Sequence, residues 1–435
     1  MSAWPSQRGR LSSWQRGLDT ASGLDLVLVS FLAAMLFVRV LTDDVSPADS
    51  RHTGSLNLSG VIAVLFMLVA LGLLVRRRHG VLPTVLAVSY LCVWTAVALN
   101  TNGASTETLR EGVREVSIVA LFVIVYNARG VVTVPIAARL VQLIGFVPAL
   151  IALYQLATHT GMDIAHNIRA NGTFAHPSSA AMFFTIATTA SLWLYLDNGR
   201  RRVDVLLTTL FAAALIATFS IDGLITLVAM LVAFGALHPG SLRSKLVPYA
   251  VACVVVLVFF ATPLGSRRVV KESSTSLATS EQEKANTSLA WRLHKWKTLL
   301  PEWERSPIVG RGLGTTVTVE HIPGNEYAGE PPLNEYVRYL VETGIVGLAI
   351  LLAALFLLVR ALVRRRRIPG TLEAGTRNAP TLALAIVVGC LIDSLADNTL
   401  LDTPTAYAVA LIVAAVLACP SVHLQPGRAA DLQPA

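Results

Sequence analysis

Cysteine and charge are both scarce in this sequence. The chain has 4 cysteines among 435 residues, and only 14% of its residues are charged. Cys92, Cys253, Cys390 and Cys419 all lie within or at the ends of apolar segments, so neither a disulfide framework nor a cysteine-based metal site is predicted. No small-residue cleavage site follows the first apolar run, which argues against a removable signal peptide.

Apolar residues dominate what is present. They make up 54% of the chain, and the mean hydropathy is +0.61, a composition typical of a polytopic membrane protein. A membrane span needs about 20 mostly apolar residues, and about twelve segments come near that length. They are 24–41, 56–75, 81–99, 114–127, 133–157, 179–196, 203–219, 222–237, 246–263, 337–359, 380–397 and 404–419. The sequence therefore predicts an all-α membrane protein, with the polar turn Ser220-Ile-Asp-Gly223 separating the seventh span from the eighth.

The basic residues predict an orientation in the membrane. Short cytoplasmic loops retain Lys and Arg during insertion, and with the N-terminus inside, the excess is roughly nineteen inside against four in the short outside loops. The clusters that fall inside are Arg8/Arg10/Arg16, Arg76–Arg78, Arg200–Arg202, Arg243/Lys245 and Arg364–Arg367. Both termini are thus expected in the cytoplasm, and the net charge of +8 needs no nucleic acid to explain it.

This orientation divides the chain into five parts. A cytoplasmic tail covers 1–22, transmembrane helices cover 23–263, an external loop covers 264–336, further transmembrane helices cover 337–420, and a second cytoplasmic tail covers 421–435. In the loop, Trp291, Trp296 and Trp303 are spaced for an amphipathic helix that lies along the bilayer surface. A lipid-phosphate substrate would fit such a surface.

Four segments on the predicted external side stand out. They are Arg169-Ala-Asn-Gly-Thr-Phe-Ala-His-Pro177, the turn Ser220–Gly223, the run from Arg292 through Trp296 to Ser306-Pro-Ile-Val-Gly-Arg-Gly-Leu-Gly314, and Asn334-Glu-Tyr-Val-Arg-Tyr-Leu-Val-Glu-Thr-Gly-Ile-Val-Gly347. In this order they resemble the O-antigen ligase and O-antigen/exopolysaccharide polymerase superfamily of bacterial membrane glycosyltransferases. The resemblance is close over residues 165–360 and rests on topology elsewhere.

The resemblance implies a GT-C-type glycosyltransferase of the cytoplasmic membrane with its active face outside. Such an enzyme takes a glycan from a polyprenyl diphosphate carrier and joins it, with inversion, to a glycan or lipid acceptor. It needs no cofactor, metal ion or nucleotide sugar, and it works in the bilayer beside other polysaccharide-assembly proteins. The leaving diphosphate calls for fixed cations in a site of low dielectric constant, and arginine presents several donors to phosphate oxygens.

By the matched segments, Arg169 and Arg292 are expected to bind the diphosphate. The other substrate-binding residues that the resemblance implies are His176, Asn334, Tyr336 and Trp296. Two positions depart from the family pattern. Leu333 stands where members carry the His that is the usual candidate for activating the acceptor hydroxyl, and Asp222 stands near a position where Arg is common.

A hydroxyl that attacks an anomeric carbon still benefits from a base within hydrogen-bond reach. Glu335 is the first choice for this base, because it shares the Asn-Glu-Tyr corner with the matched segment, and His321 and His294 are the alternatives nearest in sequence. The predicted catalytic residues are therefore Glu335, His321 and Arg292.

Other polar features have plainer interpretations. Asp43 follows Arg39 by four residues, which favours an ion pair at the membrane edge. His176-Pro177 favours a helix start over a metal site, since no second ligand stands at a suitable spacing. The glycines of 310–314 favour tight turns that pack the loop against the membrane helices.

Two other classes of protein compete with the transferase. A transporter of polysaccharide or lipid-linked oligosaccharide needs a charged central cavity and two similar halves, whereas this chain has one dominant external loop. A non-catalytic membrane protein of envelope assembly stays open because the expected His is missing. Ligase and polymerase share a donor, and the sequence does not separate them. A composition rich in Ala, Val and Arg, typical of a high-GC bacterium, favours an exopolysaccharide or cell-wall glycan over lipopolysaccharide.

Overall fold

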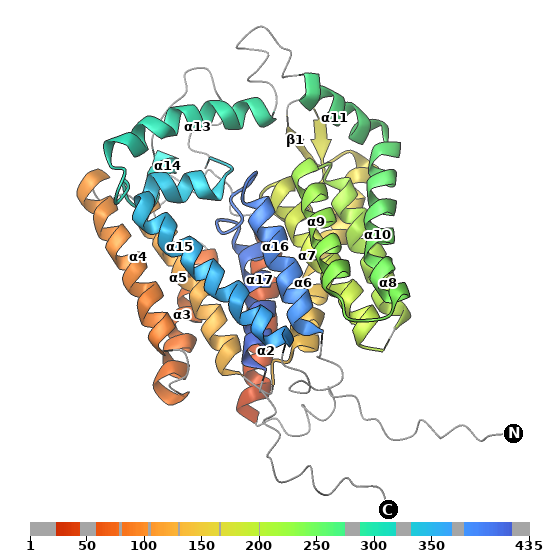
Figure 1. Ribbon diagram of the computed structural model, residues 1–435, viewed down its shortest axis with the longest axis horizontal. Helices are drawn as coiled ribbons and strands as arrows, with labels where there is room; N and C mark the ends of the chain where they lie inside the picture. Colours follow the sequence, from red (N-terminus) through yellow and green to blue (C-terminus); the bar gives the residue numbers. More distant parts are fainter. Residues whose placement is uncertain are drawn as a thin grey trace, which may run out of the picture.

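The described part of the chain is built from helices and one short hairpin (Figure 1). The computed structural model describes residues 23–43, 58–77, 81–102, 106–128, 131–164, 167–199, 201–274, 288–318, 332–367 and 378–419. Its helices are α2 (Gly23–Leu41), α3 (Leu58–Arg77), α4 (Val81–Asn102), α5 (Thr106–Asn127), α6 (Val134–Thr158), α7 (Pro177–Asp197), α8 (Arg202–Ala217), α9 (Ile221–Leu237), α10 (Leu242–Ala261), α11 (Pro263–Ser274), α13 (Ser288–Arg305), α14 (Thr315–Thr318), α15 (Glu335–Arg367), α16 (Ala379–Asp393) and α17 (Thr403–Ala418). Strands β1 (Met162–Ile164) and β2 (Asn167–Arg169) pair antiparallel.

A helix occupies each range that the sequence predicts as a membrane span. The division of the seventh and eighth ranges is confirmed, since α8 ends at Ala217 and α9 begins at Ile221. Among the described residues, six helices have the length and hydropathy to cross a membrane, namely α3, α4, α6, α7, α10 and α15, and shorter apolar helices include α9, α16 and α17. The all-α membrane architecture is confirmed, while the number of spans stays a prediction.

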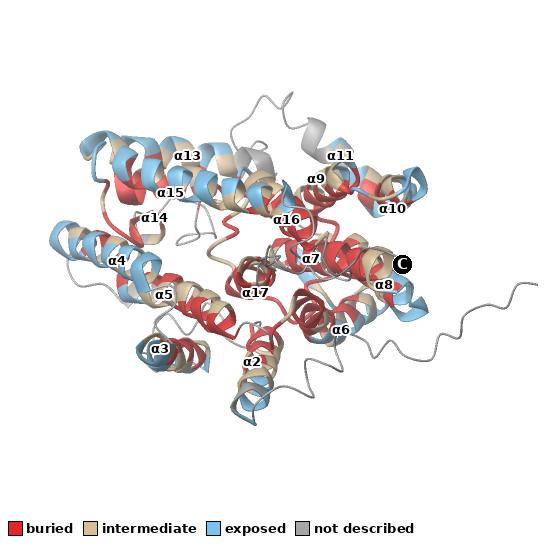
Figure 2. Cartoon of the chain, turned by 60° about the horizontal axis from the view of Figure 1, so that its bottom comes forward, coloured by how far each residue is buried: buried red, intermediate tan, exposed pale blue. Residues whose placement is uncertain are grey.

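Helix α17 lies near the middle of the bundle. Helices α2, α5, α6, α7 and α16 pack around it (Figure 2). Nearly every residue from Thr403 to Ala418 is buried, and most are Ala, Val or Leu, whose small or apolar side chains allow close packing of helices in a membrane. The polar turn that leads into α17, residues 394–402, is therefore anchored to the core.

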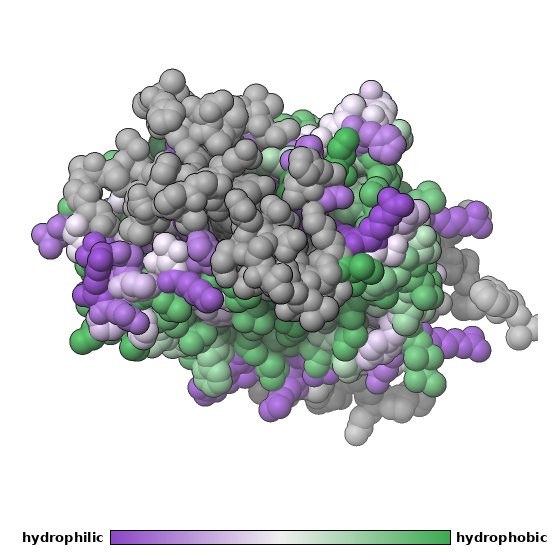
Figure 3. Space-filling model, turned by 90° about the horizontal axis from the view of Figure 1, so that it is seen from above, coloured by the Kyte–Doolittle hydropathy of each residue, from purple (hydrophilic) through white to green (hydrophobic). Residues whose placement is uncertain are grey.

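The flank of the bundle is apolar. Leu68, Leu82, Leu257 and Phe356 are each at least 60% exposed, and Figure 3, which looks onto one end of the bundle, shows hydrophobic side chains along part of its rim with hydrophilic ones between them. Soluble monomers rarely expose large contiguous apolar patches, whereas lipid tails cover such a surface without cost. This surface agrees with a helical membrane protein.

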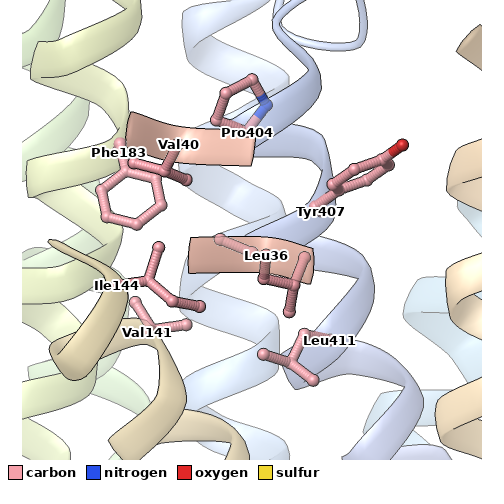
Figure 4. Close-up of a pocket in the computed structure, with 9 residues that line it drawn as sticks. Leu36, Val40, Val141, Ile144, Phe183, Pro404, Tyr407 and Leu411 are labelled. Atoms are coloured by element: carbon pink, nitrogen blue, oxygen red, sulfur yellow. The ribbon is translucent and has the colours of Figure 1, made fainter. Parts of the chain in front are cut away.

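A small apolar cavity lies inside the bundle where α2, α6, α7 and α17 meet (Figure 4). Leu36, Ile144 and Phe183 are among the side chains that line it. The hydroxyl group of Tyr407 points away from the cavity and donates to Ser117 Oγ at 2.7 Å. Since this lining offers no polar group to a sugar or a phosphate, the cavity is a feature of core packing.

One end of the bundle carries the elements that lie between α10 and α15 in sequence. Helices α11, α13 and α14 and the β1–β2 hairpin lie there, at the top of Figure 1. We call it the α13 end. Helix α10 reaches this end with its C-terminus, and α15 starts from it and runs to the opposite end, which therefore receives the basic residues 364–367.

A glycine-rich turn, residues 310–314, fastens α13 to α15. Helix α15 is kinked at Gly344, whose φ of 65° and ψ of −170° interrupt the helical hydrogen bonds. The backbone next to the kink pairs with the turn instead, and Arg311 N donates to Val341 O at 2.9 Å. The prediction of tight turns that pack this segment against the membrane helices is confirmed.

The same turn also reaches α4. Trp94 Nε1 donates to Val309 O at 2.9 Å. Gly312 has a φ of 94° and lies so near α4 that a Cβ on it would stand 2.1 Å from Ala98 Cα. Only glycine fits there, because any side chain would meet both the backbone of α4 and an unfavourable φ. The turn thus forms a clasp between α4 and α15.

Candidate functional site

The segment Arg169–Pro177 is bonded to two helices of the bundle. Gly172 N donates to Gln155 Oε1 of α6 at 2.8 Å, and Ala175 N donates to Asp43 Oδ2, just after α2, at 3.1 Å. The predicted ion pair of Asp43 is confirmed, since its other oxygen binds Arg39. These bonds make the segment a rigid support for the arginine at its start.

Arg169 is buried at the end of β2, with 3% of its surface exposed. Its Nε donates to Thr218 O, between α8 and α9, at 2.8 Å. Its Nη2 is also buried and has no hydrogen-bond partner among the described residues. A buried donor that is left unpaired costs about 1–3 kcal/mol, so an acceptor group of a ligand would be stabilising at this place.

Two further arginines lie near Arg169. Arg268 of α11 and Arg292 of α13 both act on its charge, as do Asp222 and Asp397. Arg292 Nη2 lies 3.7 Å from Asp222 Oδ2, and within the part of the chain that the structure describes Arg292 Nε is buried without a hydrogen-bond partner. We call Arg169, Arg268 and Arg292 the arginine cluster. The α13 end therefore holds a group of charges in which the three arginines of the cluster outnumber the two carboxyl groups, Asp222 and Asp397.

Burial and neighbouring charges decide how this region titrates. Burial, and after it Arg268, lowers the pKa of Arg169 to about 9, so this side chain is still charged at neutral pH. Burial, and after it Arg169, lowers the pKa of His176 to about 3, so its ring is neutral. Burial, and after it Asp222, raises the pKa of Asp397 to about 7. A carboxyl group that titrates near neutrality thus lies beside the arginine cluster.

The corner before α15 is bonded to the turn after α16. Asn334 Nδ2 donates to Leu395 O at 3.0 Å, and Glu335 N donates to Ser394 O at 2.9 Å. Helix α16 ends at Asp393, so the prediction that its span extends to 397 is corrected. The end of the helix frees residues 394–398 to form this turn.

Tyr336 and Trp296, both predicted to bind substrate, hold the same corner in place. Tyr336 OH donates to Leu391 O at 2.9 Å, and Trp296 Nε1 donates to Pro332 O at 2.7 Å. The three tryptophans of the predicted amphipathic helix do fall within one helix, α13. The matched motif residues here connect α13, α15 and α16, and their contact with substrate stays a prediction.

The histidines singled out in the sequence lie in different settings. His176 is the N-cap of α7, where its Nδ1 accepts from Ser178 N at 3.2 Å, so the interpretation of His176-Pro177 as a helix start is confirmed. His294 is exposed on α13. His321 lies outside the described residues.

Glu335, the predicted base, is bound by a neighbouring arginine. Arg338 Nε donates to Glu335 Oε1 at 3.0 Å, and Arg338 Nη2 donates to Glu115 Oε1 at 2.9 Å. Glu342 and Glu111 lie 3.5 and 3.8 Å from Arg338 Nη1. We call these five residues the Arg338 network. It is almost wholly buried and joins α5 to α15, so removing its one central cation would leave several carboxylates uncompensated.

Arg268 and Arg338 are not among the site residues predicted from the sequence. A signal existed for Arg268, because a basic residue on the predicted external side runs against the retention of Lys and Arg inside. A signal also existed for Arg338, since an ionisable residue within an apolar span is expected to have a partner, and Glu335 precedes it by three residues. What the sequence could not show is which distant residues these arginines meet.

Comparison with known proteins agrees with this assembly. Residues 206–352 match a family model described as O-Antigen ligase. The matched range runs from α8 into α15 and includes Asp222, Arg268, Arg292 and Glu335. No curated protein sequence matches the chain. The resemblance to the O-antigen ligase and polymerase superfamily is confirmed for this part of the chain.

Proposed function

Because residues 206–352 match the O-antigen ligase family, we propose that this protein is a membrane glycosyltransferase of surface polysaccharide assembly. It transfers a glycan from a polyprenyl diphosphate carrier to an acceptor sugar, either on a second carrier-linked repeat or on a lipid or surface glycan. The arginine cluster is the observation that carries the proposal. Its buried donors Arg169 Nη2 and Arg292 Nε, which bond to none of the residues that the structure describes, are suited to a multiply charged anion.

The cluster fits the charge that develops in such a reaction. When the anomeric C–O bond breaks, the carrier diphosphate leaves with added negative charge, and donors fixed in a site of low dielectric constant stabilise it without reorganising. Arginine stays charged and can contact two phosphate oxygens at once. In this proposal Arg169 and Arg292 bind the diphosphate and Arg268 assists, while metal independence stays a prediction from the resemblance.

The position of the cluster supports an external active face. It lies at the α13 end, whereas the basic residues 364–367 of α15 lie at the opposite end, and basic residues next to membrane spans favour the cytoplasmic side. With that orientation the active face looks out of the cytoplasmic membrane, and both termini lie inside. The exposed apolar flank then meets lipid, from which the polyprenyl chain would enter.

The proposal is tested by replacing Arg169 and Arg292 singly with Ala in a deletion strain that carries the variant gene. We expect each change to lower polymer formation by about 100-fold or more, since removing one donor to a developing oxyanion costs about 10²–10³ in rate. Arg305→Ala is the matched control, because Arg305 lies on the same helix as Arg292 and its side chain is 65% exposed. Normal polymer with both variants, at normal protein levels, would refute the transferase.

The lipid-linked glycans of the deletion strain separate the two acceptors. A polymerase adds one carrier-linked repeat to another, so its loss leaves single repeats on the carrier. A ligase moves finished chains to a different acceptor, so its loss leaves long chains on the carrier. The length of the accumulated glycan, read by gel and mass spectrometry, therefore assigns the reaction.

A further inference from the structure

A base is needed close to the corner before α15, where the resemblance expects a His. Leu333 stands in that place with a φ of 49°, and its apolar side chain cannot accept a proton. The turn of residues 394–398 is bonded to the same corner through Asn334 and Glu335. A side chain of this turn can therefore act as the general base in place of the His that the resemblance expects at position 333.

The carboxyl groups around the corner differ in how many of their oxygens are already bound. Glu335 Oε1 accepts from Arg338, and its Oε2 accepts from Asn398 Nδ2 at 3.2 Å. Asp393 accepts from Thr226 at 3.2 Å on one oxygen and from Thr399 at 2.9 Å on the other. Both groups therefore serve to hold the fold of this region.

Asp397 has more freedom. Its Oδ1 accepts from the backbone N–H of Asn398 at 2.7 Å, and the residue is partly exposed. The neighbouring Asn398 is held by Glu335, so the Arg338 network fixes the backbone from which the Asp397 side chain extends. Asp397 also lies within electrostatic range of Arg169 and Arg292, the two arginines of the proposed diphosphate site.

Charged groups of six elements or turns interact electrostatically with Asp397. They are Asp222 of α9, Arg292 of α13, Arg169 of β2, Glu335 of α15, Asp393 at the end of α16 and Asp402 before α17. Burial and Asp222 raise the pKa of Asp397 to about 7, against the lowering effect of Arg292. The group is thus a carboxylate above about pH 7 and a neutral acid, unable to accept a proton, below it.

We propose that Asp397 is the general base of the transfer, and this inference rests on the function proposed above. The oxygen of the acceptor hydroxyl forms a bond to the anomeric carbon of the donor glycan while the bond from that carbon to the diphosphate oxygen breaks. The hydroxyl proton moves to Asp397 Oδ2, and the bonding electron pair leaves with the diphosphate. Asp397 then returns its proton to water.

The test uses the purified full-length protein in lipid nanodiscs. The probe is the lipid-linked glycan extracted from the deletion strain, and the release of polyprenyl diphosphate is measured between about pH 5 and 9. For the wild type, kcat/KM should fall below about pH 7 as Asp397 takes up its proton. Asp397→Asn should lower kcat/KM by about 10²–10⁴-fold, the usual contribution of a general base, and the residual activity should lose this acid limb.

Three comparisons make the result decisive. Asp397→Glu should retain part of the activity together with an acid limb, and Asp397→Asn should bind polyprenyl diphosphate as the wild type does. Asp163→Asn, a matched change on the exposed face of β1, should leave the kinetics unaltered. If Asp397→Asn loses less than tenfold, keeps the acid limb, or loses carrier binding as well, the assignment of the base is overturned. If the wild type itself releases no polyprenyl diphosphate, the proposed function has failed instead.

Discussion

At the scale of the residue, Arg268 shows how a positive charge can be supplied from outside the expected motif. The resemblance expects an arginine in the turn that holds Asp222, and the structure instead brings Arg268 of α11 close to Arg169. The sequence alone does not show which of the two adjacent arginines, Arg267 or Arg268, is the more buried. The folding of α11 separates them, since Arg267 is exposed and Arg268 is partly buried.

This pair of arginines provides a matched prediction. Arg268→Ala should weaken binding of polyprenyl diphosphate by about 10- to 100-fold, because a hydrogen bond to a charged group contributes about 1.5–3 kcal/mol. Arg267→Ala should bind as the wild type does. Isothermal titration in nanodiscs measures both affinities, and an equal loss in the two variants would mean that overall charge attracts the carrier and that Arg268 has no specific part.

The two residues best placed for diphosphate binding, Arg169 and Arg292, were both predictable from sequence, because each sits in a motif with an order along the chain. Asp397 was predictable only as a polar residue of the external side. Its proximity to Arg292 and Asp222 depends on how α9, α13 and α16 pack, and such lateral contacts leave no periodic trace in a sequence.

At the scale of the element, the glycine-rich turn, residues 310–314, connects α13 to α15 and α4. It bonds to the backbone of α15 beside Gly344 and to Trp94 of α4. The family pattern contains these glycines, and the sequence favours tight turns there over a phosphate-binding loop, because no strand–loop–helix context surrounds them. The contacts with α4 and α15 show a structural use.

Gly312→Ala should therefore destabilise the protein. The new Cβ would stand 2.1 Å from Ala98 Cα at a φ of 94°, and strain of this kind costs about 2 kcal/mol or more. The melting temperature in detergent should fall by several degrees. Gly72→Ala is the control, because nothing lies within 4 Å of a Cβ there. An equal fall in melting temperature in that variant would contradict the claim that the close contact of Gly312 with α4 requires glycine.

Some elements were beyond prediction for physical reasons. The strands of the β1–β2 hairpin have 3 residues each, which is too short for an alternating pattern to stand out. Helix α11 lies in a polar stretch that carries no apolar stripe long enough to mark a span. By contrast, long apolar runs such as those of α6 and α10 were found correctly, because burial in lipid demands about 20 apolar residues and the sequence displays them directly.

At the scale of the whole molecule, the distribution of charge predicts which face looks outward. A cysteine-free variant carrying Lys297→Cys on α13 should react with a membrane-impermeant maleimide in cells whose cytoplasmic membrane is intact. The same background carrying Arg243→Cys, at the start of α10, should react only after permeabilisation. Both positions are exposed, so access depends on the side of the membrane alone, and the reverse pattern would invert the orientation and with it the external active face.

The Arg338 network also bears on the order in which the protein is made. Glu115 and Arg338 are 223 residues apart in sequence, so the ribosome synthesises Glu115 long before the arginine that pairs with it. The last helices then bring Asp397 to the corner before α15, which Arg338 helps to hold through Glu335 and Asn398. We expect a partly synthesised chain to lack the ion pair of Glu115 with Arg338 and to have its site unformed, so that no transfer begins before the final span is inserted.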